Sequence, residues 1–354
     1  MKRILAINPG STSTKIAVFK ENKNIFKTSI RHSAEELSKY KNTIDQYPFR
    51  KELILEELKK NNIDFEFHAV IGRGGLLKPI PGGVYEVNEQ MIDDVKNNSK
   101  DHASNLGCLL AADIASMLPG CKALIADPVV VDELKDIARI SGLPEIPRVS
   151  IFHALNQKAI ARRYAREVGK VYEESRLIVC HMGGGISTGV HLDGKVVDVN
   201  NGLDGEGPFS PERSGSLPSG SLIDMCFSGE YTLEDMKKKI VGNGGLVAHL
   251  GSNNLLEIMR RVEEGDKHAE LIVNAMIYNI AKRIGSAAVV LKGRIDAIIL
   301  TGGLAYSDYV VLHLKDHISF LGPVRVYPGE DEMEALATNA LSALNGILPI
   351  KCYC

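Results

Sequence analysis

Three glycine-rich turns in this sequence follow apolar, strand-like runs, and their residue types could bind phosphate. The first turn, residues 8–15, reads NPGSTSTK. Gly10 permits close approach of a backbone, and Ser11 and Ser13 offer hydroxyl donors. Lys15 adds a positive charge. The turn is not a Walker A loop, because the spacing differs and a second strand-like run follows it instead of a helix. Since most turns of this composition are only turns, this segment alone is weak evidence for a phosphate site.

The second turn is more specific, because it holds three consecutive glycines between two strand-like runs. Residues 181–189 read HMGGGISTG, with His181 before the glycines Gly183, Gly184 and Gly185. Such a run costs backbone entropy and adds no packing. A hairpin with a purely structural role would use Asn-Gly or Asp-Gly instead. The triple glycine therefore favours contact with a ligand.

The third turn, residues 300–305, reads LTGGLA and ends a buried, strand-like run. Gly302 and Gly303 lie at the carboxyl end of this run, and we expect a helix to begin at Leu304. Exposed backbone and a helix N-terminus at such a position are where α/β sheets bind ligands, although a tight loop alone would also fit. None of the three turns carries a GxGxxG fingerprint, which argues against a dehydrogenase.

Several charged residues occupy glycine- or proline-rich contexts in which a side chain can be aimed. Arg73 lies in IGRGG and Arg213 in PFSPERSG. Two arginines in constrained loops suit phosphoryl transfer, because the transition state spreads negative charge over several oxygens. Asp127 ends an apolar run, and Glu332 lies just before the last helical pattern. Such a glutamate could interact only with the helix dipole, or it could hold Mg²⁺ through water.

His153 directly follows the apolar pair Ile151 and Phe152. A histidine at this position could stabilise a group during its transfer. A buried histidine with satisfied hydrogen bonds explains the position equally well, so the sequence leaves both interpretations open.

The composition excludes other classes of protein. The 354 residues predict about two domains, and the formal net charge of −2 argues against a generally basic nucleic-acid binder. The six cysteines form no CxxC pair, which argues against a zinc ribbon or a thioredoxin-type motif. No apolar run approaches the ~18 residues of a membrane span, and the apolar run 4–7 is too short for a signal peptide. We expect a cytoplasmic protein without membrane or nucleic-acid partners.

The elements that must position these residues follow an α/β pattern, and one unit is repeated. Strand-like runs alternate with helical periodicity, which is clearest over 269–291 and 333–344. Residues 3–26 read RILAINPGSTSTKIAVFKENKNIF, and residues 176–199 read RLIVCHMGGGISTGVHLDGKVVDV. Both have the order strand, Gly/Ser/Thr turn, strand, polar turn, strand. This echo predicts a duplicated domain.

Taken together, the motifs resemble the acetate and butyrate kinase family. NPGSTSTK, GRGG, ADPV, IFH, CHMGGGIST, ERSGSLP, LTGGLA and PGEDEMEALA occur in this order along nearly the whole chain. The family belongs to a group of ATPases that includes sugar kinases, heat-shock chaperones and actin. The resemblance implies duplicated ribonuclease H-like (actin-like ATPase) α/β domains with a nucleotide cleft between them. It assigns 1–128 plus 331–354 to the domain with the acyl substrate and the first phosphate loop, and 129–330 to the domain with the second phosphate loop and the adenosine motif.

The resemblance also implies a role for each matching residue. It assigns catalytic roles to Arg73, Arg213, Asp127 and His153. It assigns contacts with ATP or ADP to Asn8, Gly10, Ser11, Ser13, Lys15, His181, Gly183, Gly184, Gly185, Gly302, Gly303 and Leu304. It assigns Mg²⁺ to Asn8 and Glu332, and the substrate pocket to Gly74, Gly75 and Phe152.

The implied reaction is reversible transfer of a phosphoryl group from MgATP to a short-chain fatty acid. Butyrate is the expected acceptor, because two valines that follow the arginine in acetate kinases are Gly74 and Gly75 here, which would leave room for a longer acyl chain. The second histidine of the acetate kinase motif FHGTSH is Gln157 here. Isobutyrate, propionate or acetate kinases of the family remain alternatives, as do a sugar kinase and a chaperone-like ATPase. The family also implies a homodimer or a higher homo-oligomer.

Overall fold

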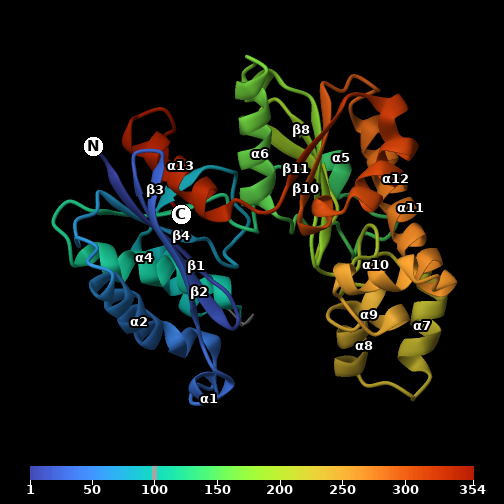
Figure 1. Cartoon of the computed structure of the whole chain (residues 1–354), viewed down its shortest axis with the longest axis horizontal. Helices are drawn as coiled ribbons and strands as arrows, with labels where there is room; N and C mark the ends of the chain where they lie inside the picture. Colours follow the sequence, from blue (N-terminus) through green and yellow to red (C-terminus); the bar gives the residue numbers. More distant parts are fainter. Residues whose placement is uncertain (98–101) are drawn as a thin grey trace. The chain divides into compact units, whose positions relative to one another are not determined.

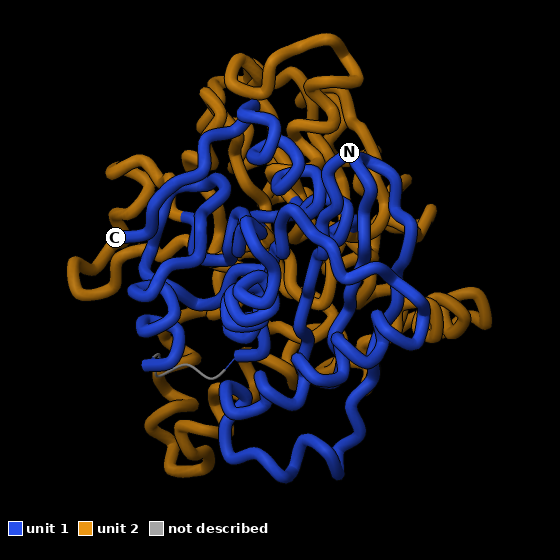
Figure 2. Tube along the Cα trace, turned by 90° about the vertical axis from the view of Figure 1, so that its left-hand side faces the viewer, with its two compact units in different colours: residues 1–131, 154–156, 331–354 blue, residues 132–153, 157–330 orange. Residues whose placement is uncertain are grey.

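The computed structural model describes residues 1–97 and 102–354, which divide into two units (Figure 2). The first unit comprises Met1–Val131, Ala154–Asn156 and Asp331–Cys354, and the second comprises Asp132–His153 and Gln157–Glu330. Each unit has its own sheet and apolar core. In the part of the chain that the structure describes, no helix is long and apolar enough to span a membrane.

The sheet of the first unit has the strand order β12-β5-β6-β4-β1-β2-β3 among the described residues. Strands β1, β2 and β3 form an antiparallel meander, and β4 and β6 extend the sheet parallel to β1. The strands are β1 (Arg3–Pro9), β2 (Ser13–Lys20), β3 (Lys23–Arg31), β4 (Ala69–Arg73), β5 (Val84–Glu86), β6 (Lys122–Ala126) and β12 (Ile350–Lys351). The α-helices are α1 (Ala34–Leu37), α2 (Tyr47–Lys60), α3 (Glu89–Lys96), α4 (Leu106–Ser116) and α13 (Glu332–Leu344), and 3₁₀ helices span Thr43–Gln46 and Ala103–Asn105.

The sheet of the second unit has the strand order β11-β10-β7-β8-β9. Strands β7, β8 and β9 are again an antiparallel meander, and β10 and β11 run parallel to β7. The strands are β7 (Leu177–Met182), β8 (Ile186–Leu192), β9 (Lys195–Val199), β10 (Ala297–Gly302) and β11 (Val324–Pro328). The α-helices are α5 (Asp136–Arg139), α6 (Ala154–Glu167), α7 (Ser219–Phe227), α8 (Leu233–Ile240), α9 (Gly245–Leu250), α10 (Leu255–Glu263), α11 (Lys267–Val290) and α12 (Asp308–Ile318), with 3₁₀ helices at Tyr172–Glu174, Gly303–Tyr306 and Ser319–Leu321.

The two sheets confirm the predicted duplication. Strands β3-β2-β1-β4-β6 and β9-β8-β7-β10-β11 share one order and one pattern of parallel and antiparallel neighbours. The pairing of the second strand with the third shifts register in both, at Val18/Phe19 and at Val190/His191. The hairpin turn after each shift has a residue with φ 53°, Glu21 in one and Asp193 in the other.

Helices pack on both faces of each sheet (Figure 1). In the first unit, α4 packs against β4 and β6, whereas α13 packs against β1 and β4. In the second unit, Leu177 and Val179 pack with α6, whereas Ile178 and Cys180 share a core with α11. The predicted helix over 269–291 is confirmed as α11, and the one over 333–344 as α13. The helix expected from Leu304 is wrong in its start, because a single 3₁₀ turn precedes α12 at Asp308.

Candidate functional site

Three of the predicted site residues lie at the carboxyl edge of the sheet of the first unit. Register pairs Ile7 of β1 with Gly72 of β4, and Arg73 with Ala126 of β6. Asn8, Arg73 and Asp127 therefore lie at the carboxyl ends of three neighbouring strands, where α/β sheets bind ligands.

Glu332, the first residue of α13, joins two of these residues into one cluster. The Nδ2 amide of Asn8 donates to Oε2 of Glu332. The Arg73 guanidinium lies at the same carboxylate, with Nη1 3.0 Å from Oε1. Both side chains of this ion pair are largely buried, so solvent screens their attraction less than it would on an open surface. The structure thus brings Asn8, Arg73 and Glu332 together, while the roles that the resemblance assigns to them stay predictions.

The oxygen atoms of this cluster suit a magnesium ion. Among the described residues, no group of three or more His, Cys, Asp or Glu side chains could hold a metal ion. Mg²⁺ usually keeps several waters and binds one or two carboxylates together with substrate phosphates. The Glu332 carboxylate and the side-chain oxygen of Asn8 fit that requirement, with phosphate and water as the remaining ligands.

Asp127 is held rigidly at the end of β6 by Gly83. Its Oδ1 accepts a hydrogen bond of 2.7 Å from the Gly83 amide, and its own amide donates to the Gly83 carbonyl over 3.0 Å. The Asp127 backbone has φ 38°, which is rare for a residue other than glycine. Strained backbone of this kind is common at functional sites. Here it positions the buried carboxylate of Asp127, which directly follows Ala126, the partner of Arg73 in the pairing of β4 with β6.

The first phosphate-loop candidate is organised by Arg50, a residue that the sequence analysis missed. The Gly10 amide donates to the Ser13 carbonyl over 2.7 Å, which closes the turn. The fully buried Arg50 of α2 donates to the carbonyls of Gly10 at 2.7 Å, Ser11 at 3.1 Å and Ser13 at 3.3 Å. Arg50 thus satisfies three carbonyls of the turn, while the side chain of Lys15 is exposed.

Burial lowers the pKa of Arg50 to about 10, so the side chain keeps its charge at neutral pH. A signal for this residue was present in the sequence. Arg50, Ile54 and Leu58 follow helical spacing and form the buried stripe of α2, so the arginine occupies a core position.

The glycine turn between β7 and β8 is packed against Arg213. The Gly183 amide donates to the Gly185 carbonyl over 3.0 Å. A β-carbon at Gly185 would overlap Nη1 of Arg213, which itself donates to the Gly202 carbonyl. The third glycine is therefore required by the chain's own arginine, whereas ligand contact remains the explanation proposed for Gly183 and Gly184. Burial lowers the pKa of the Arg213 guanidinium.

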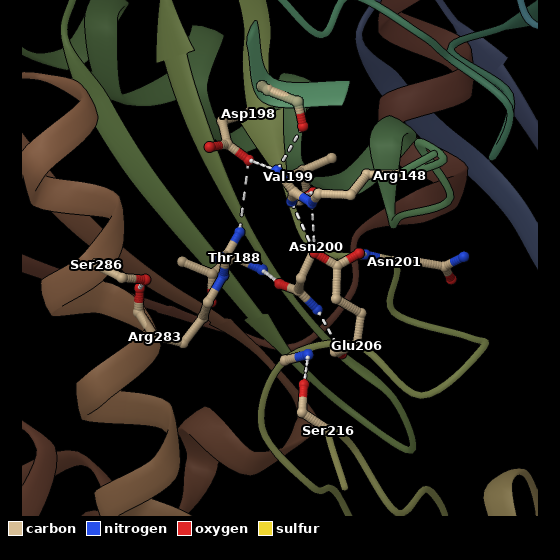
Figure 3. A network of polar contacts seen from close by, with 12 residues as sticks. Arg148, Thr188, Asp198, Val199, Asn200, Asn201, Glu206, Ser216, Arg283 and Ser286 are labelled. Carbon is tan, nitrogen blue, oxygen red and sulfur yellow. Dashed lines mark hydrogen bonds and ion pairs between the residues drawn. The ribbon is translucent and has the colours of Figure 1, made fainter. Parts of the chain in front are cut away.

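The loop that carries Arg213 is anchored by an ionic network (Figure 3). Arg148 lies 3.0 Å from Asp198 and 2.7 Å from Glu206, and Arg283 of α11 approaches Asp198 to 3.7 Å. Asn200 accepts from the Thr188 amide of β8 over 2.8 Å. These contacts tie the start of the loop to β8, β9 and α11.

Two predicted histidines stack beside this turn. The rings of His153 and His181 are 3.8 Å apart between centroids, at 16° to each other. Nε2 of His181 lies 2.9 Å from Oε1 of Glu330, and Nδ1 of His153 lies 2.8 Å from Oγ of Ser187. Phe152, the neighbour of His153, is buried. The second unit therefore assembles His153, His181, Arg213 and the glycine turn.

The third turn allows β10 to approach β7 closely. Gly302 has φ 89°, and a β-carbon there would overlap the Met182 carbonyl. Gly302 also exchanges two hydrogen bonds with Gly329, of 3.1 and 3.0 Å. Leu304 is buried, whereas a β-carbon at Gly303 would meet no atom within 4 Å. Backbone packing thus explains Gly302, and Gly303 keeps open space beside it.

Gly74 and Gly75 serve packing within the first unit. A β-carbon at Gly74 would lie 2.5 Å from Cβ of Pro128, and one at Gly75 would lie 2.6 Å from Cα of Asn105. The space that larger residues would occupy is therefore filled by the chain itself. Gly74 and Gly75 therefore leave no extra room for an acyl chain, although they follow Arg73 directly.

Comparison with known proteins decides the family. The acetokinase family profile matches residues 146–333. A protein of Bacteroides thetaiotaomicron named "Probable butyrate kinase" is 61% identical over 351 residues, which cover 99% of each chain. Butyrate kinase 2 of Clostridium acetobutylicum is 55% identical over 353 residues, again 99% of each chain. The chain belongs to the acetokinase family.

Solved structures of the acetokinase family show the same fold. The crystal structure of Porphyromonas gingivalis acetate kinase matches with a TM-score of 0.81 at 20% identity, over 97% of this chain and 100% of that one. The two α/β sheets described above are thus the acetokinase fold. Membership of a kinase family implies that the protein uses ATP.

Proposed function

We propose that this acetokinase transfers the γ-phosphoryl group of ATP reversibly to butyrate, which yields butyryl phosphate and ADP. The observation that carries the proposal is the 61% identity, over 99% of both chains, to a relative with butyrate kinase in its name. The clusters at Glu332 and at the glycine turn of β7 and β8 support it, because they offer the charges that phosphoryl transfer needs.

The chemistry requires no general base. Butyrate is ionised at neutral pH, so a carboxylate oxygen can attack the γ-phosphorus directly. The new O–P bond forms while the bond from phosphorus to the β-phosphate oxygen breaks, and ADP leaves with that electron pair. Because no proton is transferred in this step, the protein contributes positioning and stabilisation of charge.

The first unit would supply one group of contacts. We assign Arg73 to the butyrate carboxylate and the transferred phosphoryl, with Glu332 holding its guanidinium. The turn at Gly10–Lys15 would bind phosphate oxygens through its amides and hydroxyls. Mg²⁺, when bound by Glu332 and Asn8, would neutralise charge on the phosphates. Asp127 would orient water or the ion from its fixed position.

The second unit carries its own set of proposed contacts. Arg213 and His153 would stabilise the transferred phosphoryl, and His181 with Gly183 and Gly184 would bind the remaining phosphates. Gly303 and Leu304 would approach the adenosine. Gly185 and Gly302 contribute indirectly, because their missing side chains let Arg213 and β7 take their positions.

The proposal that butyrate is the preferred acceptor rests on the relatives, since the space beside Gly74 and Gly75 is filled by Pro128 and Asn105. Phe152 stays a proposed neighbour of the acyl chain, whereas Gly74 and Gly75 supply no room for it. Isobutyrate, propionate and acetate are the competing acceptors, and they are the substrates against which the proposal must be measured.

Trapping with hydroxylamine tests the proposed reaction, because it converts an acyl phosphate into a coloured hydroxamate. We expect butyrate- and ATP-dependent hydroxamate with the purified chain, and a loss of roughly 1000-fold in kcat for Arg73→Ala and for Arg213→Ala. Arg325→Ala is the control, because Arg325 is an exposed arginine of β11. Near-normal turnover in both arginine variants would refute their assignment.

We also propose that the protein forms a homodimer whose interface excludes the apolar face of α11. That face, including Val273 and Ile280, is buried in the core of the second unit. Leu271, Tyr278 and Val289 of the same helix are exposed and are the side chains available for a partner. Sedimentation analysis of Leu271→Asp against the unchanged chain tests this interface.

A further inference from the structure

Five side chains of the second unit form one continuous chain of hydrogen bonds that ends at His153. Successive contacts join Tyr172 Oη to His191 Nδ1 at 2.9 Å and His191 Nε2 to Gln157 Oε1 at 3.1 Å. They continue from Gln157 Nε2 to Ser187 Oγ at 2.9 Å and from Ser187 Oγ to His153 Nδ1 at 2.8 Å. His191, Gln157 and Ser187 are completely buried. Water therefore does not compete for the bonds among these three residues.

The direction of each bond follows from the donors and acceptors available. The Gln157 amide nitrogen donates to the Ser187 carbonyl at 3.0 Å as well as to its Oγ, so Oε1 of Gln157 must accept. His191 then donates from Nε2 and accepts the Tyr172 hydroxyl proton at Nδ1. Burial, together with the charges of Lys158 and Arg162, lowers the pKa of His191 well below its ordinary value, which agrees with a neutral ring.

The hydrogen bonds of Ser187 determine which ring nitrogen of His153 accepts. Its Oγ accepts from the side-chain amide of Gln157 over 2.9 Å. The backbone amide of His153 also donates to this Oγ, over 3.4 Å. Both lone pairs of the hydroxyl are thereby used, and its proton is left for Nδ1 of His153. A ring that accepts at Nδ1 carries its own proton at Nε2.

Residue positions on β8 and α6 allow this series of hydrogen bonds. Ser187, Gly189 and His191 alternate along β8, so they face the same side of the sheet as Gln157 of α6. A β-carbon at Gly189 would overlap Oε1 of Gln157 and would lie 3.2 Å from Cγ1 of Val196. A glycine at this position is therefore required for Gln157 to reach between Ser187 and His191.

We propose that Ser187 and Gln157 are positioning residues that hold His153 as the neutral tautomer with its proton on Nε2. The Nε2–H group then donates a hydrogen bond to an oxygen of the phosphoryl group during transfer. This last step rests on the proposed function. A fixed donor suits the reaction, since the carboxylate acceptor brings no proton that a base must remove. Stacking on His181 holds the plane of the ring, while Ser187 fixes its protonation.

Nitrogen-15 NMR of histidine-labelled protein reads the tautomer directly, because protonated and unprotonated ring nitrogens resonate far apart. His153→Gln identifies the His153 signals. Ser187→Ala removes the donor to Nδ1, and Gln157→Glu keeps the shape of residue 157 but replaces its donor by an acceptor. Thr188→Val is the matched control, since Thr188 is a buried β8 neighbour whose hydroxyl contacts Cys180 in the core shared with α11.

We expect unchanged protein and Thr188→Val to show the Nε2–H form of His153. Ser187→Ala and Gln157→Glu should show loss of that form and a fall in kcat of roughly 10- to 100-fold, with little change in the KM for butyrate. Detection of the Nδ1–H form in unchanged protein, or an unaltered His153 signal in both variants, would overturn the inference. Failure of the proposed function has a different signature, namely no butyrate-dependent turnover by the unchanged protein, and the NMR result does not depend on turnover.

Discussion

Arg73 and Glu332 lie 259 residues apart in the sequence, and the fold brings Nη1 of Arg73 to 3.0 Å from Oε1 of Glu332. The carboxylate comes from the first residue of α13, and the guanidinium from the end of β4. Asn8 of β1 donates to the same carboxylate. Glu332 therefore fixes two other residues of the proposed site and is also the anionic ligand that magnesium would need.

Substitution of Glu332 should weaken the use of magnesium. Glu332→Gln keeps the size of the side chain but removes its charge, so Arg73 loses its ionic partner and Mg²⁺ loses its carboxylate. We expect a lower kcat and a Mg²⁺ concentration at half-maximal rate that rises by about tenfold or more. Titration of the hydroxamate rate with MgCl₂ at fixed ATP measures both. Glu334→Gln is the control, because Glu334 lies on the same helix and pairs with the half-exposed Lys27. Equal magnesium dependence in the two variants would remove Glu332 from the metal site.

Loss of the buried Arg50 should disorganise the first phosphate turn. In Arg50→Met, the partly buried carbonyls of Gly10 and Ser13 and the carbonyl of the exposed Ser11 lose their charged donor, and a hydrogen bond from a charged group contributes about 1.5–3 kcal/mol. We expect the free energy of unfolding to fall by about that amount and the KM for ATP to rise. Urea unfolding and initial rates measure these effects. Lys51 lies next to Arg50 on α2, and Lys51→Met removes only a partly exposed ion pair with Asp113 of α4, so it should change either quantity little. A normal KM for ATP in Arg50→Met would show that the turn holds its shape without Arg50.

A methyl group at Gly185 should act on catalysis through Arg213. Because the β-carbon would overlap the guanidinium, Gly185→Ala must push Arg213 away from the Gly202 carbonyl. We expect kcat to fall towards the value of Arg213→Ala, and the double variant to be no slower than Arg213→Ala alone. Gly220→Ala is the control, since a β-carbon at Gly220 of α7 meets no atom within 4 Å. Additive losses in the double variant would mean that Gly185 acts independently of Arg213.

His32 should make the first unit sensitive to acid. Burial and the nearby charge of Arg50 lower the pKa of His32 from its ordinary 6.5 to about 4, and its Nε2 lies 2.8 Å from Thr14 Oγ1. A lowered pKa means that the unfolded chain binds the proton more readily, so stability is lost as the pH falls from about 6.5 to about 4. The loss from this residue is at most ~1.4 kcal/mol per pH unit.

Urea unfolding at several pH values checks this dependence. His32→Gln should show a smaller decrease in unfolding free energy between pH 6.5 and 4 than the unchanged protein. His268→Gln, which replaces an exposed histidine, should retain the full decrease. Parallel curves for His32→Gln and the unchanged protein would contradict the assignment.

The sequence predicted the architecture because local patterns carry it. The echo between 3–26 and 176–199 reflects two meanders with the same strand order and the same register shift. Strand ends at Asn8, Arg73 and Asp127 follow from apolar runs, and parallel pairing places them at one edge. The start of α12 was misjudged, because a 3₁₀ turn at Gly303–Tyr306 leaves the same sequence pattern as a first helical turn.

Contacts between distant residues could not be predicted in the same way. The pair of Arg73 with Glu332 depends on where α13 packs, which no local pattern encodes. Arg50 was overlooked because charged residues on helices are usually exposed, although its helical spacing with Ile54 and Leu58 indicated a buried position. Gly74 was attributed to a ligand pocket, but its neighbour is Pro128, which only the folded chain brings there.

The central claim is that the acyl acceptor is butyrate, and the most direct test is kcat/KM for four acids with the purified chain. Acetate, propionate, butyrate and isobutyrate are compared under one set of MgATP conditions by the hydroxamate assay. The account predicts the highest kcat/KM for butyrate, at least about tenfold above acetate, in keeping with the discrimination that one or two methylene groups allow. A preference for acetate, or no butyrate-dependent acyl phosphate, would contradict it.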